Sequence, residues 1–315
     1  MKIILKSKKN YICTIAIGNL HYKVWEKYIL PSWKIYCKKN KIGIIVFKNH
    51  LIEKKSLYWK KPTWQKMLIG SEILKKKIKA ETICYLDTDI LINPLSPNIF
   101  NFHDKKKISL VSSRKKLAYD FFDSSKRVSF YRKKYYNKKY PLNSSILFTN
   151  KQTYRYHNLK PMPDEACMGL FMFNLKMFSN KMYKWFYKYK RNIKSFTGGG
   201  DQIHFNYEIQ NNCKVNWLNY RFQTLWYFEM ANYYPFLYQK KIEKKLIKNC
   251  ILSSLAKNYF LHFAGSWGEG KIYKKVKLEN SDLNNSSLRK FNNYLNKKIK
   301  AISKGRILPK NYILK

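Results

Sequence analysis

The chain has 315 residues, which is long enough for one large α/β domain or two smaller domains with an ample core. Its 45% hydrophobic and 26% charged residues indicate a globular protein and exclude a disordered one. Lys and Arg number 64 against 18 Asp and Glu, so the formal net charge of +46 predicts attraction to nucleic acid, anionic lipid, nucleotide phosphates or acidic polysaccharide.

The cysteines and the apolar runs bear on the compartment. The six cysteines are scattered and include no C-x-x-C pair, which favours free thiols in a reducing compartment over a zinc site. No window reaches the ~18 apolar residues that a membrane span needs, and residues 1–10 have too short an apolar core for a signal peptide. We therefore expect a cytoplasmic protein, or one bound to the inner face of a membrane.

The first part of the chain predicts a strand, a helix and a second strand, at Tyr11–Ile17, 24–36 and Ile42–Phe47. A Gly-Asn turn follows the first strand. A further amphipathic helix is predicted at 60–78, before the next strand. This order is how a nucleotide-binding half-domain begins.

Two of the rare acids, Asp87 and Asp89, directly follow an apolar strand predicted at 82–86. A short apolar run at 90–92 comes next and stops at Asn-Pro. Open α/β sheets present their sites beyond such strand ends, and two adjacent carboxylates repel unless a cation joins them. Oxygen ligands favour Mg²⁺ or Mn²⁺. The alternative is a loop in which Asp87 caps a following helix and Asp89 is solvated.

The middle of the chain continues the α/β pattern around one irregular segment. A strand is predicted at 108–112, another at 170–173, and a helix with an apolar core stripe at 177–189. Residues 114–160 lose periodicity and become basic and aromatic, which suits single-stranded nucleic acid or stacking on sugar rings. We interpret this segment as an insertion on the acceptor side of a site.

Two later segments carry polar groups at the ends of apolar elements. Three glycines lead to Asp201 at the predicted N-cap of a helix, where the backbone can approach a ligand closely; the alternative is a simple turn with a good cap. A strand and loop are predicted at 215–227. His262 ends an apolar strand before a Gly-rich loop, which suits a metal ligand and a pyrophosphate cradle, or else a hydrogen-bonded core histidine.

Together, the D-x-D of residues 87–89, the G-G-D-Q of 199–202 and the H-x-x-G of 262–265 resemble, in this order, the GT-A glycosyltransferases of the glycogenin and bacterial lipo-oligosaccharide galactosyltransferase kind. The resemblance implies an α/β GT-A (Rossmann-like) fold with a mixed, mostly parallel sheet flanked by helices. It also implies a domain at 1–272, in which 11–113 binds the nucleotide and 114–272 supplies acceptor and catalytic groups.

The remaining residues, 273–315, form a basic C-terminal tail in this scheme. Its stretch 288–302 has the pattern of a basic amphipathic helix lying on an anionic membrane, or of a helix packed back on the domain.

The resemblance also implies roles for single residues. Mn²⁺ or Mg²⁺ would be held by Asp87, Asp89 and His262; Asp201 would bind the donor sugar, and Gln202 would lie near its anomeric carbon. The further donor-binding positions that it implies are Ala16, Ile17, Gly18, Asn19, Lys66, Asp87, Thr88, Gly199, Gly200, Gly265 and Lys271.

The chain departs from the family pattern at three positions. Cys167 and Gln223 each stand where an Asn is usual, and Gly268 stands where a Lys is usual, so Lys271 is the next basic residue. Asp164 and Glu165, just before the strand at 170–173, are either candidates to meet an acceptor hydroxyl or solvated turn residues.

The predicted function is metal-dependent transfer of a sugar from a nucleotide-diphosphate sugar, by default a UDP-sugar, to a glycan or lipid-linked acceptor in cell-surface polysaccharide biosynthesis. The motif order favours retention; inversion would need Asp164, Glu165 or Asp201 as base. We expect peripheral contact with anionic membrane and no specific nucleic acid partner. A nucleic-acid-binding protein explains the charge but not the motifs, and a metal-dependent phosphoryl-transfer enzyme leaves G-G-D-Q unexplained.

Overall fold

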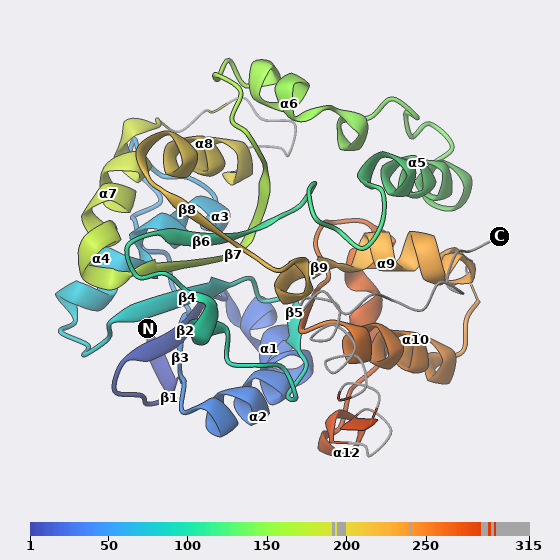
Figure 1. Ribbon diagram of the computed structural model, residues 1–315, viewed down its shortest axis with the longest axis horizontal. Coiled ribbons are helices and arrows are strands. Elements are labelled where there is room, and N and C mark those ends of the chain that lie inside the picture. The colour runs from blue at the N-terminus through green and yellow to red at the C-terminus, as the bar shows by residue number, and fades with distance from the viewer. Residues whose placement is uncertain (191–192, 194–199, 240, 285–288, 291–292, 294–315) are drawn as a thin grey trace, which may run out of the picture.

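A seven-strand sheet lies at the centre of the computed structural model, which describes residues 1–190, 193, 200–239, 241–284, 289–290 and 293 (Figure 1). Its strand order is β1-β3-β2-β4-β7-β6-β8. The strands are β1 (Lys2–Leu5), β2 (Asn10–Ile15), β3 (Gly43–Phe47), β4 (Thr82–Leu86), β6 (Ile108–Ser112), β7 (Ala166–Asn174) and β8 (Val215–Leu218).

The sheet is mixed. β2 runs parallel to both β3 and β4, as the strand–helix–strand opening predicts, and β6 runs parallel to β8. β7 lies antiparallel between β4 and β6, and β1 is an antiparallel edge strand that the sequence pattern did not indicate. The predicted mixed α/β sheet is confirmed, with parallel and antiparallel pairs equal in number rather than mostly parallel.

A second sheet of three short strands positions the candidate site. It consists of β5 (Ile90–Ile92), β10 (Phe260–His262) and β9 (Thr224–Leu225), with β10 in the middle. β10 pairs antiparallel with β5, so that His262 lies opposite Ile90. This register carries the end of β10 to the turn that follows β4.

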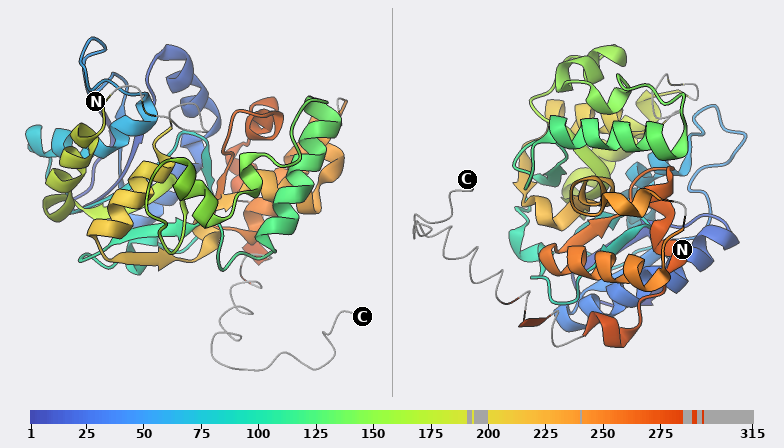
Figure 2. Two further views of the ribbon diagram at one scale, coloured as in Figure 1. Left: turned by 90° about the horizontal axis from the view of Figure 1, so that it is seen from above. Right: turned by 90° about the vertical axis from the view of Figure 1, so that its right-hand side faces the viewer.

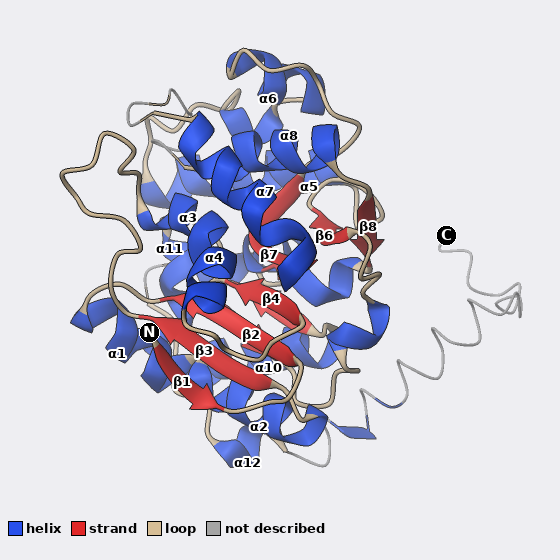
Figure 3. Cartoon of the chain, turned by 90° about the vertical axis from the view of Figure 1, so that its left-hand side faces the viewer, coloured by secondary structure: helices blue, strands red, loops and turns tan. Residues whose placement is uncertain are grey.

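Helices cover both faces of the large sheet (Figures 1 and 3). One face packs on α1 (Asn19–Tyr28) and α2 (Leu30–Asn40), and the other on α4 (Ile69–Lys75) and α7 (Leu175–Lys188). Neighbouring residues of a strand enter different cores: Ile12 faces α1 and α2, whereas Cys13 faces the opposite layer.

Two predicted helices are each divided. The helix predicted at 24–36 is α1 and α2, separated at Ile29, because Pro31 in the first turn of α2 cannot donate a backbone hydrogen bond to the preceding turn. The helix predicted at 60–78 is α3 (Pro62–Gln65), a 3₁₀ turn at Lys66–Leu68, and α4.

Of the remaining helices, α8 packs on β7 and α12 packs on α2. In the insertion, α5 packs beside α9 (Figures 1 and 2). These helices are α5 (Phe121–Tyr131), α6 (Asn150–Tyr156), α8 (Gln202–Asn212), α9 (Trp226–Tyr233), α10 (Lys244–Lys257), α11 (Gly268–Lys271) and α12 (Asn280–Leu283). Short 3₁₀ segments occupy Ile99–Phe102, Ser145–Leu147, Tyr220–Gln223, Pro235–Tyr238 and Ile272–Lys275, and a π-helical segment occupies Arg132–Tyr136.

The C-terminal region is described only in part. The amphipathic helix predicted at 288–302 falls almost wholly outside the described residues. Among the residues that the structure describes, every helix is too short or too polar to cross a bilayer.

Candidate metal centre and adjoining cavity

The structure brings together the three side chains predicted as metal ligands. Asp87 and Asp89 lie in the turn between β4 and β5, and His262 is the last residue of β10. Their candidate ligand atoms all lie within 4.8 Å of one another. His262 Nε2 is 3.2 Å from Asp89 Oδ1 and 3.8 Å from Asp87 Oδ2.

The surroundings of the two carboxylates fit a bound cation better than a helix-capping loop. Asp89 Oδ1 is buried and has no hydrogen-bond partner among the described residues, although a buried carboxylate oxygen ordinarily accepts at least one bond. Asp87 Oδ1 accepts a 2.6 Å bond from the Tyr85 hydroxyl. The helix-capping alternative for Asp87 is wrong, because the turn leads into strand β5. Two carboxylates and one imidazole form a donor set that could hold a divalent cation.

Two neighbours on the far side of the ring orient His262. Its Nδ1 lies 3.2 Å from Gln223 Nε2 and 3.6 Å from Cys167 Sγ, which leaves Nε2 for the carboxylates. Such second contacts fix the orientation of a metal-binding imidazole. Burial alone would lower the pKa of His262, but Cys167 and Asp89 outweigh burial and raise it well above 6.5.

Gly169 gives the centre the space that it needs. It lies in β7, and its carbonyl accepts a 2.8 Å bond from the backbone N–H of Asp87. A Cβ at this position would come within 2.3 Å of His262 Cε1 and 2.9 Å of Asp87 Oδ2. Only glycine therefore lets the strand pass this close to the ligands.

Lys66 connects the metal centre to the G-G-D-Q segment. Its amine, on a side chain only 2% exposed, lies 2.7 Å from the Met168 carbonyl, 3.3 Å from Asp201 Oδ2 and 3.8 Å from Asp87 Oδ1. Burial alone would lower the pKa of Lys66, but Asp201 and Asp87 together raise it above its ordinary value. The amine is therefore a charged bridge between two acids, and its contact with nucleotide phosphates stays a prediction.

Asp201 does not act as the helix cap that the sequence suggests. It precedes α8, but its side chain makes no capping hydrogen bond among the described residues and faces Lys66 instead. Burial raises the pKa of Asp201, and Lys66 opposes that rise. The part of the alternative in which the Asp201 side chain caps the helix is therefore wrong, whereas Gly198 and Gly199 lie outside the described residues.

A cavity of about 740 Å³ adjoins the metal centre. Cys167, which contacts His262, and Gln202, the first residue of α8, lie in its wall. The loop after β10 contributes Gly265 and Trp267. The ring of Trp267 makes an edge contact with Tyr140 from the insertion, with centroids 5.1 Å apart, so the opening has aromatic faces of the kind that stack on sugars.

The insertion is fixed to this loop by one ion pair and one stacked ring. Arg132 Nε donates to Glu269 Oε1 at 2.6 Å, and Glu269 is wholly buried in α11. Tyr136 stacks on Trp267 with an interplanar angle of 9°. The basic-aromatic segment thus forms one side of the cavity, as its interpretation as an acceptor-side insertion requires.

The other predicted donor-binding positions differ in burial and in backbone conformation. Ala16 is buried at the end of β2, and Ile17–Asn19 form the more exposed turn into α1, where Gly18 has φ 87°. Thr88 is half-buried in the D-x-D turn, Gly265 has φ 95°, and Lys271 ends α11. No contact among the described residues joins the 16–19 turn or Lys271 to the three ligands. Gly199 lies outside the described residues, whereas Gly200 lies within them.

The pattern analysis missed the Arg132–Glu269 pair and the contact of Arg114 with Glu165. One signal could have found them. With only 18 acids against 64 Lys and Arg, an Asp or Glu beside an apolar run is expected to pair with a basic side chain in most cases.

No protein-family model and no curated protein matches this chain. Among solved structures it is similar to a glycosyltransferase involved in glycosylation of the major capsid of PBCV-1, with 8% identity, 84% of this chain and 97% of that chain covered, and TM-score 0.46. It is also similar to the WbbM bifunctional glycosyltransferase, with 10% identity, 91% of this chain and 52% of that chain covered, and TM-score 0.48. A third similar structure is the galactosyltransferase LgtC in complex with donor and acceptor sugar analogs, with 12% identity, 86% of this chain and 98% of that chain covered, and TM-score 0.42. The chain spans about half of the WbbM structure.

Proposed function

We propose that this chain is a metal-dependent glycosyltransferase that moves a sugar from a nucleotide-diphosphate sugar to a glycan or lipid-linked acceptor. One observation carries the proposal. Asp87, Asp89 and His262 converge at the end of a central strand, beside a cavity with Gln202 in its wall. A binding protein for polyanions has no need of two carboxylates and an imidazole that converge on one point.

The residues around the site would have different roles according to their positions. Asp87, Asp89 and His262 Nε2 would hold Mn²⁺ or Mg²⁺, which when bound supplies Lewis acidity to the diphosphate leaving group. Lys66 would fix the position of Asp201 for the donor sugar. The aromatic side of the cavity, formed by Trp267 and Tyr140, would receive the acceptor.

The surroundings of the acids favour retention of configuration. Asp201 is paired with Lys66, and Glu165 with Arg114 at 2.7 Å. Asp164 accepts bonds from the Ser112 hydroxyl and the Glu165 backbone. Each candidate base for an inverting reaction is thus held by a donor, so the departing phosphate oxygen is the better acceptor for the proton of the incoming hydroxyl.

The test is calorimetric titration of UDP with and without Mn²⁺, on the wild type, Asp89→Ala and the control Asp123→Ala, whose side chain is exposed. We expect metal-dependent binding in the wild type and the control and none in Asp89→Ala. Absence of binding of UDP, GDP and CDP to the wild type would refute the proposal. Steeply salt-dependent binding of unrelated oligonucleotides in its place would favour a polyanion-binding protein.

A further inference from the structure

Gln202 has a defined orientation because of its neighbour Glu165. Gln202 Nε2 lies 2.6 Å from Glu165 Oε1, and both residues line the cavity. An ionised carboxylate only accepts hydrogen bonds, so the end of the amide that faces it is the NH₂ group. The amide oxygen of Gln202 is therefore the end turned away from Glu165.

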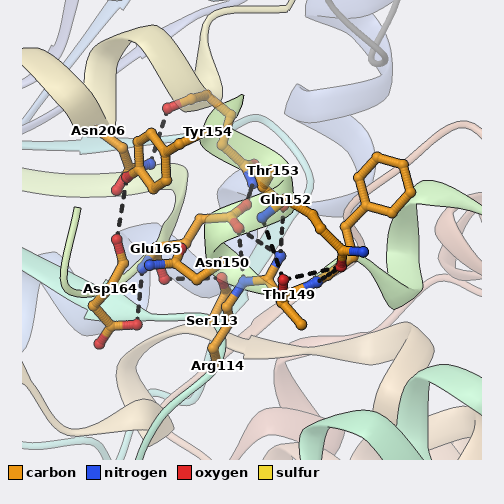
Figure 4. A network of polar contacts seen from close by, with 12 residues as sticks. Ser113, Arg114, Thr149, Asn150, Gln152, Thr153, Tyr154, Asp164, Glu165 and Asn206 are labelled. Atoms are coloured by element: carbon orange, nitrogen blue, oxygen red, sulfur yellow. Dashed lines mark hydrogen bonds and ion pairs between the residues drawn. The ribbon is translucent and has the colours of Figure 1, made fainter. Parts of the chain in front are cut away.

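Arg114 holds the Glu165 carboxylate in place. Arg114 and Glu165 lie side by side (Figure 4), with Arg114 Nε and Nη2 both 2.7 Å from Glu165 Oε2. Glu165 Oε1 is therefore left for Gln202. The guanidinium is held in turn by the Phe148 carbonyl at 2.7 Å and the Thr153 hydroxyl at 3.1 Å. Because the side chain of Glu165 is almost wholly buried, the pair is rigid and shielded from solvent.

We propose that Glu165 and Arg114 are a positioning pair that presents the amide oxygen, and not the amide nitrogen, of Gln202 to the reacting sugar. This inference rests on the proposed function. Glycosyl transfer passes through an oxocarbenium-like state with positive charge near the anomeric carbon. A fixed carbonyl dipole with its oxygen toward that charge stabilises it, whereas the reversed amide would oppose it.

The same contacts argue against a reacting role for Glu165. Its Oε2 accepts from Arg114 and its Oε1 from Gln202, so both oxygens already have donors. Glu165 therefore acts through Gln202. The insertion takes part, because Phe148 and Thr153, which hold Arg114, both belong to it.

The decisive variant is Glu165→Gln, which keeps the shape but lets the amide of Gln202 bind in either orientation. We expect kcat for transfer or hydrolysis of UDP-glucose and UDP-galactose to fall by roughly 10²-fold, the loss typical of one misdirected dipole. The Kd of UDP with Mn²⁺ and the donor KM should stay within about threefold. The kcat of Arg114→Lys should lie between those of the wild type and Glu165→Gln. Glu53→Gln, a carboxylate-to-amide control at an exposed position, should have the kcat of the wild type.

A double-variant cycle separates positioning from a general structural effect. If Glu165 acts through Gln202, Glu165→Gln should change kcat by less than about threefold in a Gln202→Ala background. A full, additive loss in that background, or an unchanged kcat in Glu165→Gln alone, would overturn the inference.

A spectroscopic readout is independent of the donor sugar. The side-chain NH₂ resonances of Gln202, assigned by their disappearance in Gln202→Ala, should shift in Glu165→Gln and not in Glu53→Gln; unchanged resonances would overturn the inference. If the wild type binds UDP but this test fails, only the inference is refuted and the proposed function stands. If the wild type binds no nucleotide, the proposed function and the inference are both refuted.

Discussion

Gly169→Ala should abolish the metal centre while leaving a folded chain. The added Cβ would lie 2.3 Å from His262 Cε1, 2.9 Å from Asp87 Oδ2 and 2.9 Å from Gln223 Nε2. All three atoms belong to the centre or to its support. β7 pairs with β4 as far as Leu170, and the Gly169 carbonyl accepts the Asp87 N–H, whereas the register with β6 shifts between Ala166 and Phe171. The β4 side therefore opposes movement of the strand, and we expect the imidazole to move instead.

The displacement is large compared with what a metal site tolerates. Relieving the contact with His262 requires a shift of about 1 Å, the difference between 2.3 Å and an ordinary contact of 3.4 Å. Metal–ligand distances hold within about 0.2 Å. Loss of mere outer support already costs roughly 10–100-fold in metal affinity, so at least this loss is expected here. Overpacking of the core should destabilise the chain by about 1–3 kcal/mol.

The assay pairs Mn²⁺-dependent UDP titration with urea unfolding, and Gly70→Ala is the matched control. A Cβ on Gly70 would lie 2.3 Å from Ser179 Oγ, between α4 and α7 and outside the metal centre. Both variants should lose similar stability, but only Gly169→Ala should lose metal-dependent binding. Wild-type Mn²⁺ and UDP affinity in Gly169→Ala would show that the close packing of His262 against β7 does not position the ligands.

Three further changes test the buried charges. Glu269→Ala should lower the free energy of unfolding by about 3–5 kcal/mol in urea, because it leaves Arg132 buried and unpaired; replacing both residues by Met should cost much less. Asp201→Asn would be nearly neutral for a helix cap, so a loss of about 1 kcal/mol or more in urea unfolding would identify Asp201 as the partner of Lys66. Burial lowers the pKa of His204 from 6.5 to about 4, so the unfolded chain binds the proton more readily in that interval. Wild-type stability should therefore be full above pH 6.5 and fall as the pH drops toward 4; melting curves of His204→Phe should lack this component, on the order of 3 kcal/mol.

The central strands could be predicted because their patterns are local. The runs at 42–47, 82–86 and 108–112 are mostly apolar, as strands buried on both faces are, and each lies within one residue of the observed strand. β1 escaped notice because an edge strand of four residues, two of them exposed, has no such run. The direction of β7 could not be predicted either, because it depends on the path of the insertion 114–160 and no local signal encodes it.

Only those site residues that belong to a sequence motif could be predicted. D-x-D and H-x-x-G name the ligands, but the need for Gly169 comes from strand pairing that neither motif contains. Asp201 shows the opposite failure. Its place before a helix gave a strong local signal for capping, yet Lys66, distant in sequence, takes its carboxylate.

The scarcity of acids in this chain separates structural carboxylates from the candidate ligands. Five of the six buried acids each meet a Lys or Arg at 3.4 Å or less, namely Glu165, Asp201, Glu208, Glu229 and Glu269, and the sixth, Asp164, accepts hydrogen bonds from the Ser112 hydroxyl and the Glu165 backbone. Asp89 differs from all six, because its one ion-pair partner within the described residues is the imidazole of His262. With 64 Lys and Arg in the sequence, a cationic side chain could readily have occupied this place. That Asp89 is left to an imidazole is therefore a physical argument, independent of any motif, that a cation from outside the chain completes the site.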